Sequence, residues 1–315
     1  MSQTLLPVIA TPQTLATLPE EGVWLANFIS SHSKRGYSKA VHGFLAFHGL
    51  QTVAELREVK PAHLIAWRDS LLEEGKSPRT VNVRLSALSS LFLHLCHAQL
   101  VPDNPVRSVK RCRVNSDRVK TPAITPAQVR AMLNAPDQST LKGMRDLAFL
   151  SILFFTGCRI AEACRLKVGD FHQDSGYWCL GFLVKGGKEN RVAINPELTA
   201  TLQIYFELVG HRGDKTAPLL LPLRRLKGGG HIAQERHLTT AGATLIFQSY
   251  ADQVSLPDNV SPHSARTTFA TTALEKGCPI EAVQKTLAHS QINTTRAYDQ
   301  RQHRHRDSAS FVVRY

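Results

Sequence analysis

A basic segment between Pro105 and Pro122 divides the 315-residue chain into two parts. It shows little hydrophobic periodicity, and one acid, Asp117, stands among its six basic residues: Arg107, Lys110, Arg111, Arg113, Arg118 and Lys120. Such a segment adds little to a core, and 315 residues are more than one core usually needs, so we interpret it as an interdomain linker. The expected organisation is an extension (1–17), a helical domain (18–104), the linker (105–123) and a second domain (124–315).

The charge balance favours a polyanionic partner. Lysine and arginine number 38 against 25 acids, a formal net charge of +13, although a basic protein without such a partner would show the same balance. The six cysteines lack CxxC spacing, so neither a zinc ribbon nor a disulfide framework is indicated. No run approaches the roughly 18 apolar residues of a membrane span. We therefore expect a protein of the reducing cytoplasm that does not enter a membrane.

The clearest helix of residues 18–104 begins at Ser77-Pro78, an N-cap followed by a first-turn proline. Apolar residues then recur at helical spacing: Val81, Leu85, Leu88, Phe92 and Leu95. We interpret this stripe as core. Arg79 and Arg84 fall outside it and form a basic surface, which either binds a partner or is simply solvated.

The second domain is predicted to be mainly helical with a small antiparallel sheet. Thr125-Pro126 with Gln128 has the pattern of a capping box, and the dense apolar run 147–154 predicts a fully buried helix. Tyr177–Val184 and Arg191–Ile194 predict two strands joined by a glycine turn. Helical patterns return from Leu238 onward.

Four separated segments of the second domain contain residues suited to phosphate chemistry. In the first, a buried helix breaks at Gly157 and restarts with Arg159 at its head. The other three carry Lys185 on the strand turn, His263 and Arg266 opening a helix, and His289 with Tyr298.

The order of these residues resembles that of the tyrosine recombinase family, which includes phage integrases and Xer-type recombinases. The family's catalytic order is Arg, Lys, His-x-x-Arg, His, Tyr, and the chain supplies Arg159, Lys185, His263, Arg266, His289 and Tyr298. The contexts TGxRxxE and HSxxxTTxxY add specificity, because HxxR alone occurs by chance in many proteins. The resemblance extends to the helical amino-terminal domain and so covers most of the chain.

The resemblance implies a fold and an activity. The fold is a helical, SAM-like core-binding domain followed by the tyrosine recombinase catalytic domain. The activity is site-specific recombination, in which DNA strands are cut and rejoined through a 3′-phosphotyrosyl intermediate without metal, ATP or another cofactor. The expected partners are double-stranded DNA with paired half-sites, three further copies of the chain in a tetramer, and an accessory directionality protein. The location is then the cytoplasm, at the nucleoid when DNA is bound.

Elementary chemistry suits these residues to the reaction. Attack at phosphorus adds negative charge to the non-bridging oxygens, and always-protonated arginine forks such as Arg159 and Arg266 are the best ligands for it. Tyr298 is the nucleophile, and it needs activation because a free tyrosine hydroxyl has a pKa of about 10.

The remaining residues would move protons. His263 is the candidate to assist the proton transfer from the nucleophile, and His289 the candidate to hydrogen-bond the phosphate. Lys185 is the candidate general acid for the departing 5′-oxygen, with Lys188 as the alternative on the same turn.

Each residue also has an ordinary structural interpretation. Glu162 three positions after Arg159 predicts a helical salt bridge, the turn lysines could be merely exposed, and single histidines are more often structural. The chain departs from the family pattern at Ala265, Thr267 and Ala288, where leucine, histidine and glycine are common. None of the three removes a reacting group.

Three other functions compete with recombination. A type IB topoisomerase uses similar chemistry, and a DNA-binding protein could keep the scaffold without catalysis. A metal-dependent nuclease has less support, since no carboxylate cluster lies among the candidate residues. In family members resembling this chain, the segment after the tyrosine packs on a neighbouring subunit, which makes residues 311–315 a candidate for exchange between subunits.

Overall fold

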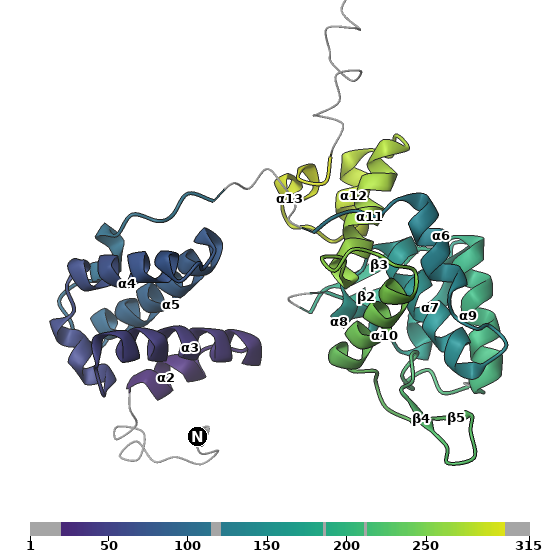
Figure 1. The fold of residues 1–315 in the computed structure, drawn as a ribbon, viewed down its shortest axis with the longest axis horizontal. Helices are drawn as coiled ribbons and strands as arrows, with labels where there is room; N and C mark the ends of the chain where they lie inside the picture. The colour runs from purple at the N-terminus through teal and green to yellow at the C-terminus, as the bar shows by residue number, and fades with distance from the viewer. Residues whose placement is uncertain (1–19, 115–120, 185–186, 211–212, 300–315) are drawn as a thin grey trace, which may run out of the picture. The chain divides into compact units, whose positions relative to one another are not determined.

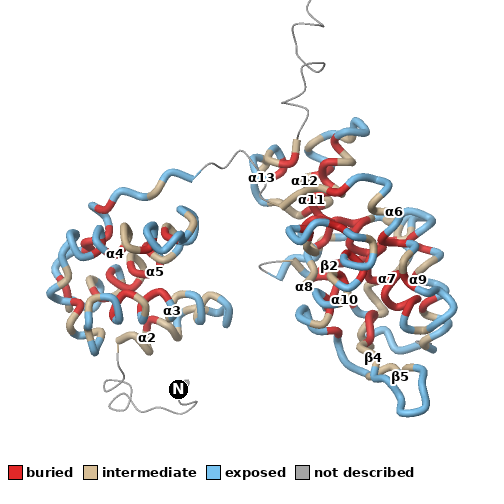
Figure 2. Tube along the Cα trace, in the orientation of Figure 1, coloured by how far each residue is buried: buried red, intermediate tan, exposed pale blue. Residues whose placement is uncertain are grey.

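The computed structural model describes residues 20–114, 121–184, 187–210 and 213–299, and the chain divides into two compact units, residues 1–115 and 116–315 (Figure 1). Each unit has a hydrophobic core of its own, seen as the buried positions inside it in Figure 2. No helix of the described residues is long and apolar enough to cross a membrane.

The first unit is entirely helical in its described part. Its elements are α2 (Glu20–Ala26), α3 (Ser31–His48), η1 (Val53–Glu58), α4 (Pro61–Glu73), α5 (Pro78–His97) and η2 (Pro105–Ser108). The predicted start of α5 is confirmed, because Ser77 Oγ accepts a hydrogen bond from the Thr80 amide at 3.2 Å. The predicted apolar stripe of α5 is buried and packs against α3 and α4.

The first part of the basic segment belongs to this unit. Val106 and Val109 are 2% and 4% exposed and lie in its core, with η2 packed against α4 and α5. Asn82 of α5 then binds the backbone of Cys112, donating to its carbonyl and accepting from its amide, both at 2.9 Å. The sequence placed these residues in the linker because two valines three positions apart are too few to produce a visible periodicity. Residues 115–120 lie outside the described part of the chain.

The second unit is built around one buried helix. Its helices are α6 (Pro126–Asn134), α7 (Leu141–Thr156), α8 (Ile160–Ala163), η3 (Val168–Asp170), α9 (Pro196–Val209), α10 (Thr240–Gln253), α11 (Pro262–Glu275), α12 (Ile280–Thr286) and α13 (Ile292–Arg296). The capping box of Thr125 and Gln128 at the head of α6 is confirmed. Thirteen of the sixteen residues of α7 are buried, as predicted, because α6, α9 and α11 pack around it.

Two small antiparallel sheets accompany these helices. One has the order β1 (Phe171–Asp174), β2 (Tyr177–Leu183), β3 (Glu189–Ala193), and the other pairs β4 (Leu223–Arg225) with β5 (His231–Ala233). The predicted pair of strands is confirmed by β2 and β3, which pair with Cys179 opposite Ala193. The Val184 amide donates to the Lys188 carbonyl at 2.8 Å and closes the turn between them. The fold class predicted from the sequence is therefore correct.

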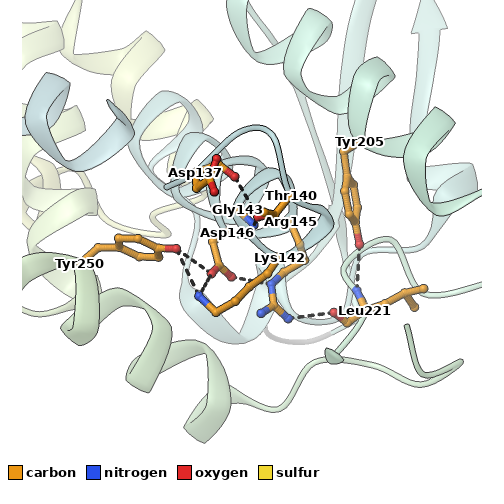
Figure 3. Close-up of polar contacts among 9 residues, drawn as sticks. All are labelled: Asp137, Thr140, Lys142, Gly143, Arg145, Asp146, Tyr205, Leu221 and Tyr250. Atoms are coloured by element: carbon orange, nitrogen blue, oxygen red, sulfur yellow. Dashed lines mark hydrogen bonds and ion pairs between the residues drawn. The ribbon is translucent and has the colours of Figure 1, made fainter. Parts of the chain in front are cut away.

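A buried polar network fixes the head of α7 (Figure 3). Asp146 is fully buried and receives hydrogen bonds from Arg145 Nε, from Lys142 Nζ at 2.9 Å and from the Tyr250 hydroxyl of α10 at 2.9 Å. Arg145 also donates to the Leu221 carbonyl at 2.9 Å. A buried carboxylate is tolerated only with such partners, so this network connects α7, α10 and the segment before β4.

Candidate active site

Arg159 stands at the sharp turn between α7 and α8. The predicted break is confirmed at Gly157, which has a φ of 63°. A Cβ there would lie 2.6 Å from the Phe269 side chain and 2.8 Å from that of Leu287, so glycine is needed for two reasons. The turn leaves Arg159 as the N-cap residue of α8.

The salt bridge predicted as the ordinary interpretation of Arg159 is present. Its Nη1 lies 2.8 Å from Glu162 Oε1, while its backbone amide donates to Glu162 Oε2 at 2.7 Å. The Glu162 side chain is 9% exposed and that of Arg159 is 45% exposed. The buried carboxylate therefore anchors a guanidinium that still reaches solvent.

Arg266 lies on the second turn of α11 and is 1% exposed. It donates to the carbonyls of Gly157 and Leu287, both at 2.7 Å, and its Nη2 also lies 2.7 Å from His289 Nε2. Burial, and then the charge of Arg159, lower the pKa of Arg266. Arg266 therefore connects three segments that are far apart in sequence.

His289 occupies the loop between α12 and α13. Ala288 before it has a φ of 50°, a left-handed conformation that is uncommon outside glycine. Gln284 holds the His289 backbone from both sides, since its carbonyl accepts from the His289 amide at 3.1 Å and its Nε2 donates to the His289 carbonyl at 3.0 Å. The imidazole Nδ1 lies 2.9 Å from Thr295 Oγ1.

Tyr298 follows α13 and is 5% exposed. Its ring stacks on that of His289, and it packs with residues of α11 and α12 in a small core. The Tyr298 amide donates to the Thr295 carbonyl at 3.0 Å, and its own carbonyl accepts from Thr271 Oγ1 at 3.3 Å.

The electrostatics of the two histidines reflect this grouping. Burial, and then repulsion by the charges of Arg266, Arg159 and, in its protonated form, His263, lower the pKa of His289 to about 4. Loss of solvent around its ring, and then the same two arginines, lower the pKa of His263, although that residue is exposed as a whole. Both imidazoles are therefore neutral near pH 7. The structure brings five of the six predicted residues together.

Lys185, the sixth predicted residue, lies outside the described residues. Lys188, its alternative, is exposed at the end of the same turn. The hairpin is joined to the site, because Asn190 Nδ2 of β3 donates to the Thr286 carbonyl at 2.9 Å, next to the Leu287 that binds Arg266.

Three residues that contact the site were not singled out from the sequence: Gln284, Thr295 and Asn190. Thr295 was within reach, since it belongs to the HSxxxTTxxY pattern. Gln284 and Asn190 bind backbone carbonyl or amide groups, and no local sequence signal distinguishes them from other polar residues.

Two family models together match most of the chain. The family model "Phage integrase family" matches residues 122–305, and "Phage integrase, N-terminal SAM-like domain" matches residues 20–99. Tyrosine recombinase XerC of Herpetosiphon aurantiacus is 31% identical over 291 residues, covering 91% of this chain and 88% of the relative. Tyrosine recombinase XerD of Listeria innocua is 27% identical over 275 residues, covering 86% and 88%.

Solved structures with the same fold include DNA complexes. A lambda integrase dimer bound to a COC′ core site superposes with a TM-score of 0.64 at 16% identity, covering 86% of this chain and 93% of that one. XerH recombinase bound to palindromic difH substrate, a post-cleavage complex, gives 0.66 at 19% identity, covering 88% and 80%. Sequence and fold agree, and the chain belongs to the phage integrase family of tyrosine recombinases.

Proposed function

We propose that this chain is a site-specific DNA recombinase that cuts and rejoins strands through a covalent bond between Tyr298 and a 3′-phosphate. The observation that carries the proposal is the hydrogen bond from Arg266 to His289, together with the ring stack of His289 and Tyr298. It joins a phosphate-binding group, an imidazole and a nucleophile from two separate segments, α11 and the α12–α13 region.

The proposed reaction is a reversible transfer of one phosphoryl bond. Arg159 and Arg266 bind the non-bridging oxygens and stabilise the charge that accumulates on them. Tyr298 Oη attacks phosphorus, its proton passes to His263, and the bond to the 5′-oxygen breaks.

The departing oxygen takes a proton from Lys185, with Lys188 as the alternative, and leaves as a 5′-hydroxyl. Once Arg266 has turned toward DNA, His289 hydrogen-bonds the phosphate through a proton on Nε2. A 5′-hydroxyl from another strand reverses the steps, so the bond energy is conserved and neither ATP nor a metal is required.

The proposed partner is double-stranded DNA that carries paired half-sites, with four copies of the chain assembled on two sites in the nucleoid. The formal charge of +13 supports binding to a polyanion. A lambda integrase tetramer bound to a Holliday junction has the same fold, with a TM-score of 0.67. An accessory directionality protein belongs to this proposal too, as does exchange of the carboxy-terminal tail between subunits. The tail lies outside the described residues.

The two units would share the work. The first unit (18–104 by sequence) would bind the core DNA, and the second (124–315) would carry out the chemistry. Basic residues of α5 that reach solvent, the exposed Arg79 and the half-buried Arg84, are consistent with DNA contact by the first unit.

Covalent trapping in cells tests the proposal. Cells expressing the chain are denatured rapidly, free DNA is removed, and the DNA that remains attached to protein is sequenced. The wild type and a Tyr177→Phe control, which removes an exposed tyrosine of β2, should yield the same short set of sites. Tyr298→Phe should yield none, because it lacks the attacking oxygen.

The opposite outcomes are equally clear. DNA attached to Tyr298→Phe would exclude Tyr298 as the nucleophile. Plasmids carrying two copies of the recovered site should exchange strands, whereas relaxation without exchange would indicate a topoisomerase.

A further inference from the structure

A continuous hydrogen-bonded chain runs through the site from Thr295 to His289 to Arg266. Thr295 Oγ1 lies 2.9 Å from His289 Nδ1, and His289 Nε2 lies 2.7 Å from Arg266 Nη2. Both ends are enclosed, since Thr295 is 0% exposed and Arg266 is 1% exposed. Water competes poorly for these groups, so the partners determine where each proton lies.

The position of the imidazole proton follows from what an arginine can do. A guanidinium donates hydrogen bonds and accepts none, so His289 Nε2 must be the acceptor and carry no proton. The single proton of the neutral ring is then on Nδ1, and Thr295 Oγ1 accepts it. Burial, and then the nearby charges of Arg266 and Arg159, lower the pKa of His289 and disfavour a second proton.

Thr295 also holds the nucleophile. Its backbone carbonyl accepts from the Tyr298 amide at 3.0 Å, while its side chain holds the ring on which Tyr298 stacks. One buried threonine therefore contacts both the histidine and the tyrosine segment.

We propose that Thr295 is a positioning residue of the recombinase: it accepts the Nδ1 proton of His289 and so keeps Nε2 available to orient the Arg266 guanidinium. In the DNA-free protein His289 is then an acceptor that holds Arg266, not a phosphate donor. An incoming phosphate oxygen takes the place of Nε2 on Arg266 Nη2. The part of this inference that concerns catalysis rests on the proposed function, whereas the location of the proton does not.

Three variants test the role of the Thr295 hydroxyl apart from the rest of that side chain. Thr295→Val keeps the shape and removes the acceptor, and Thr295→Ser keeps the acceptor. Thr294→Val makes the same change at the neighbouring exposed threonine and is the matched control. Should Thr295→Val fail to fold by thermal unfolding, Thr295→Cys replaces it, with a weaker acceptor of similar size.

The first measurement is the tautomer of His289 in the full-length, DNA-free protein. Nitrogen NMR of histidine-labelled protein distinguishes protonated from unprotonated ring nitrogens, and His289→Gln identifies the signals. Wild type, Thr295→Ser and Thr294→Val should show a protonated Nδ1, and Thr295→Val should show a mixture containing protonated Nε2. An unchanged tautomer in Thr295→Val overturns the inference.

The second measurement is the yield of covalent complex on a nicked duplex that carries a site recovered by cellular trapping. Thr295→Val should cleave about tenfold more slowly, the size expected for one lost hydrogen bond. Thr295→Ser should stay within about threefold of wild type, with DNA affinity preserved in both. The positioning role is overturned if Thr295→Val and Thr295→Ser lose cleavage rate equally, or if Thr295→Val cleaves as fast as the wild type. A wild type that never forms a covalent complex overturns the proposed function, and the NMR result still decides the proton location.

Discussion

The rings of His289 and Tyr298 stack with their centroids 5.9 Å apart and their planes 4° from parallel. A parallel stack limits the rotation of the phenol ring, and so limits the directions in which its hydroxyl can point. The histidine therefore contributes to the orientation of the nucleophile in addition to its hydrogen bonds.

Replacement of His289 separates stacking from hydrogen bonding. His289→Phe keeps a ring against Tyr298 and loses both nitrogens, whereas His289→Ala loses the ring as well. We expect covalent complex formation to fall about tenfold in the Phe variant and by a further fivefold or so in the Ala variant, since an aromatic pair is worth roughly 0.5–1.5 kcal/mol. Cleavage rates on the nicked duplex measure both. Equal rates in the two variants would show that the stack contributes nothing.

Acid should destabilise the second unit through its histidines. The folded state lowers the pKa of His289 to about 4, below the unfolded value of about 6.5, so the unfolded chain binds more protons between these values. The contribution of His289 to the unfolding free energy is therefore fully present above about pH 6.5 and is lost as the pH falls toward 4. The lowered pKa of His263 acts in the same direction.

His289→Gln should reduce this pH dependence. After allowance for solvent screening, we expect the difference in unfolding free energy across the window to be on the order of 1 kcal/mol. Hydrogen exchange of α11 and α12 from pH 4.5 to 7.5 measures it. His231→Gln, at a histidine of β5, is the control and should leave the slope as in wild type. If the unfolding free energy of His289→Gln depended on pH more steeply than that of the wild type, the predicted direction of the effect would be wrong.

Two positions with positive φ should respond to substitution in opposite ways. Ala288 has a φ of 50°, so Ala288→Gly should relieve the strain of a left-handed residue and stabilise the loop before His289 by roughly 0.5 kcal/mol. Gly157→Ala adds the same strain and drives a Cβ into Phe269 and Leu287, so it should cost more than about 2 kcal/mol. Thermal unfolding of the two variants measures both changes in stability. A lower unfolding temperature for Ala288→Gly than for the wild type would contradict the prediction for that position.

The buried network around Asp146 should matter far more than a surface ion pair. Asp146→Asn removes the charge that Arg145 and Lys142 share, and leaving the buried Arg145 without a charged partner should cost about 3–5 kcal/mol. Asp174→Asn breaks the exposed pair with Arg191 and should cost far less, because solvent screens both charges. Hydrogen exchange of α7 peptides in the two variants gives the comparison. Similar protection in both would show that the network is not needed for stability.

Local signals account for most of the fold that the sequence predicted. The cap at Ser77, the capping box at Thr125 and the break at Gly157 depend on neighbouring residues, and each is present in the structure. β1 was not predicted because its four residues, Phe171–Asp174, carry no clear alternation of apolar side chains. The burial of Val106 was missed because it depends on contacts with α4 and α5 that no local pattern reveals.

At the candidate site, too, the sequence identified residues but not their distant contacts. The order of residue types shared with the family identified five residues that the structure brings together, but it did not predict the hydrogen bonds between them. The sequence could not show that Arg266 is buried against two carbonyls, because those carbonyls belong to positions 109 and 21 residues away. For Arg159 the family role and the ordinary salt bridge were alternatives, and the geometry makes the salt bridge the support of the guanidinium.

Arg266 differs from Arg145, the other buried arginine in the described part of this unit, in what surrounds its charge. Arg145 contacts a carboxylate and is neutralised by it, whereas the hydrogen bonds of Arg266 among the described residues go to two carbonyls and an imidazole. Such dipoles solvate a cation but leave its net charge intact. At Arg266 the protein thus keeps a full positive charge beneath its surface, and a single anionic oxygen can neutralise it by displacing only a neutral imidazole.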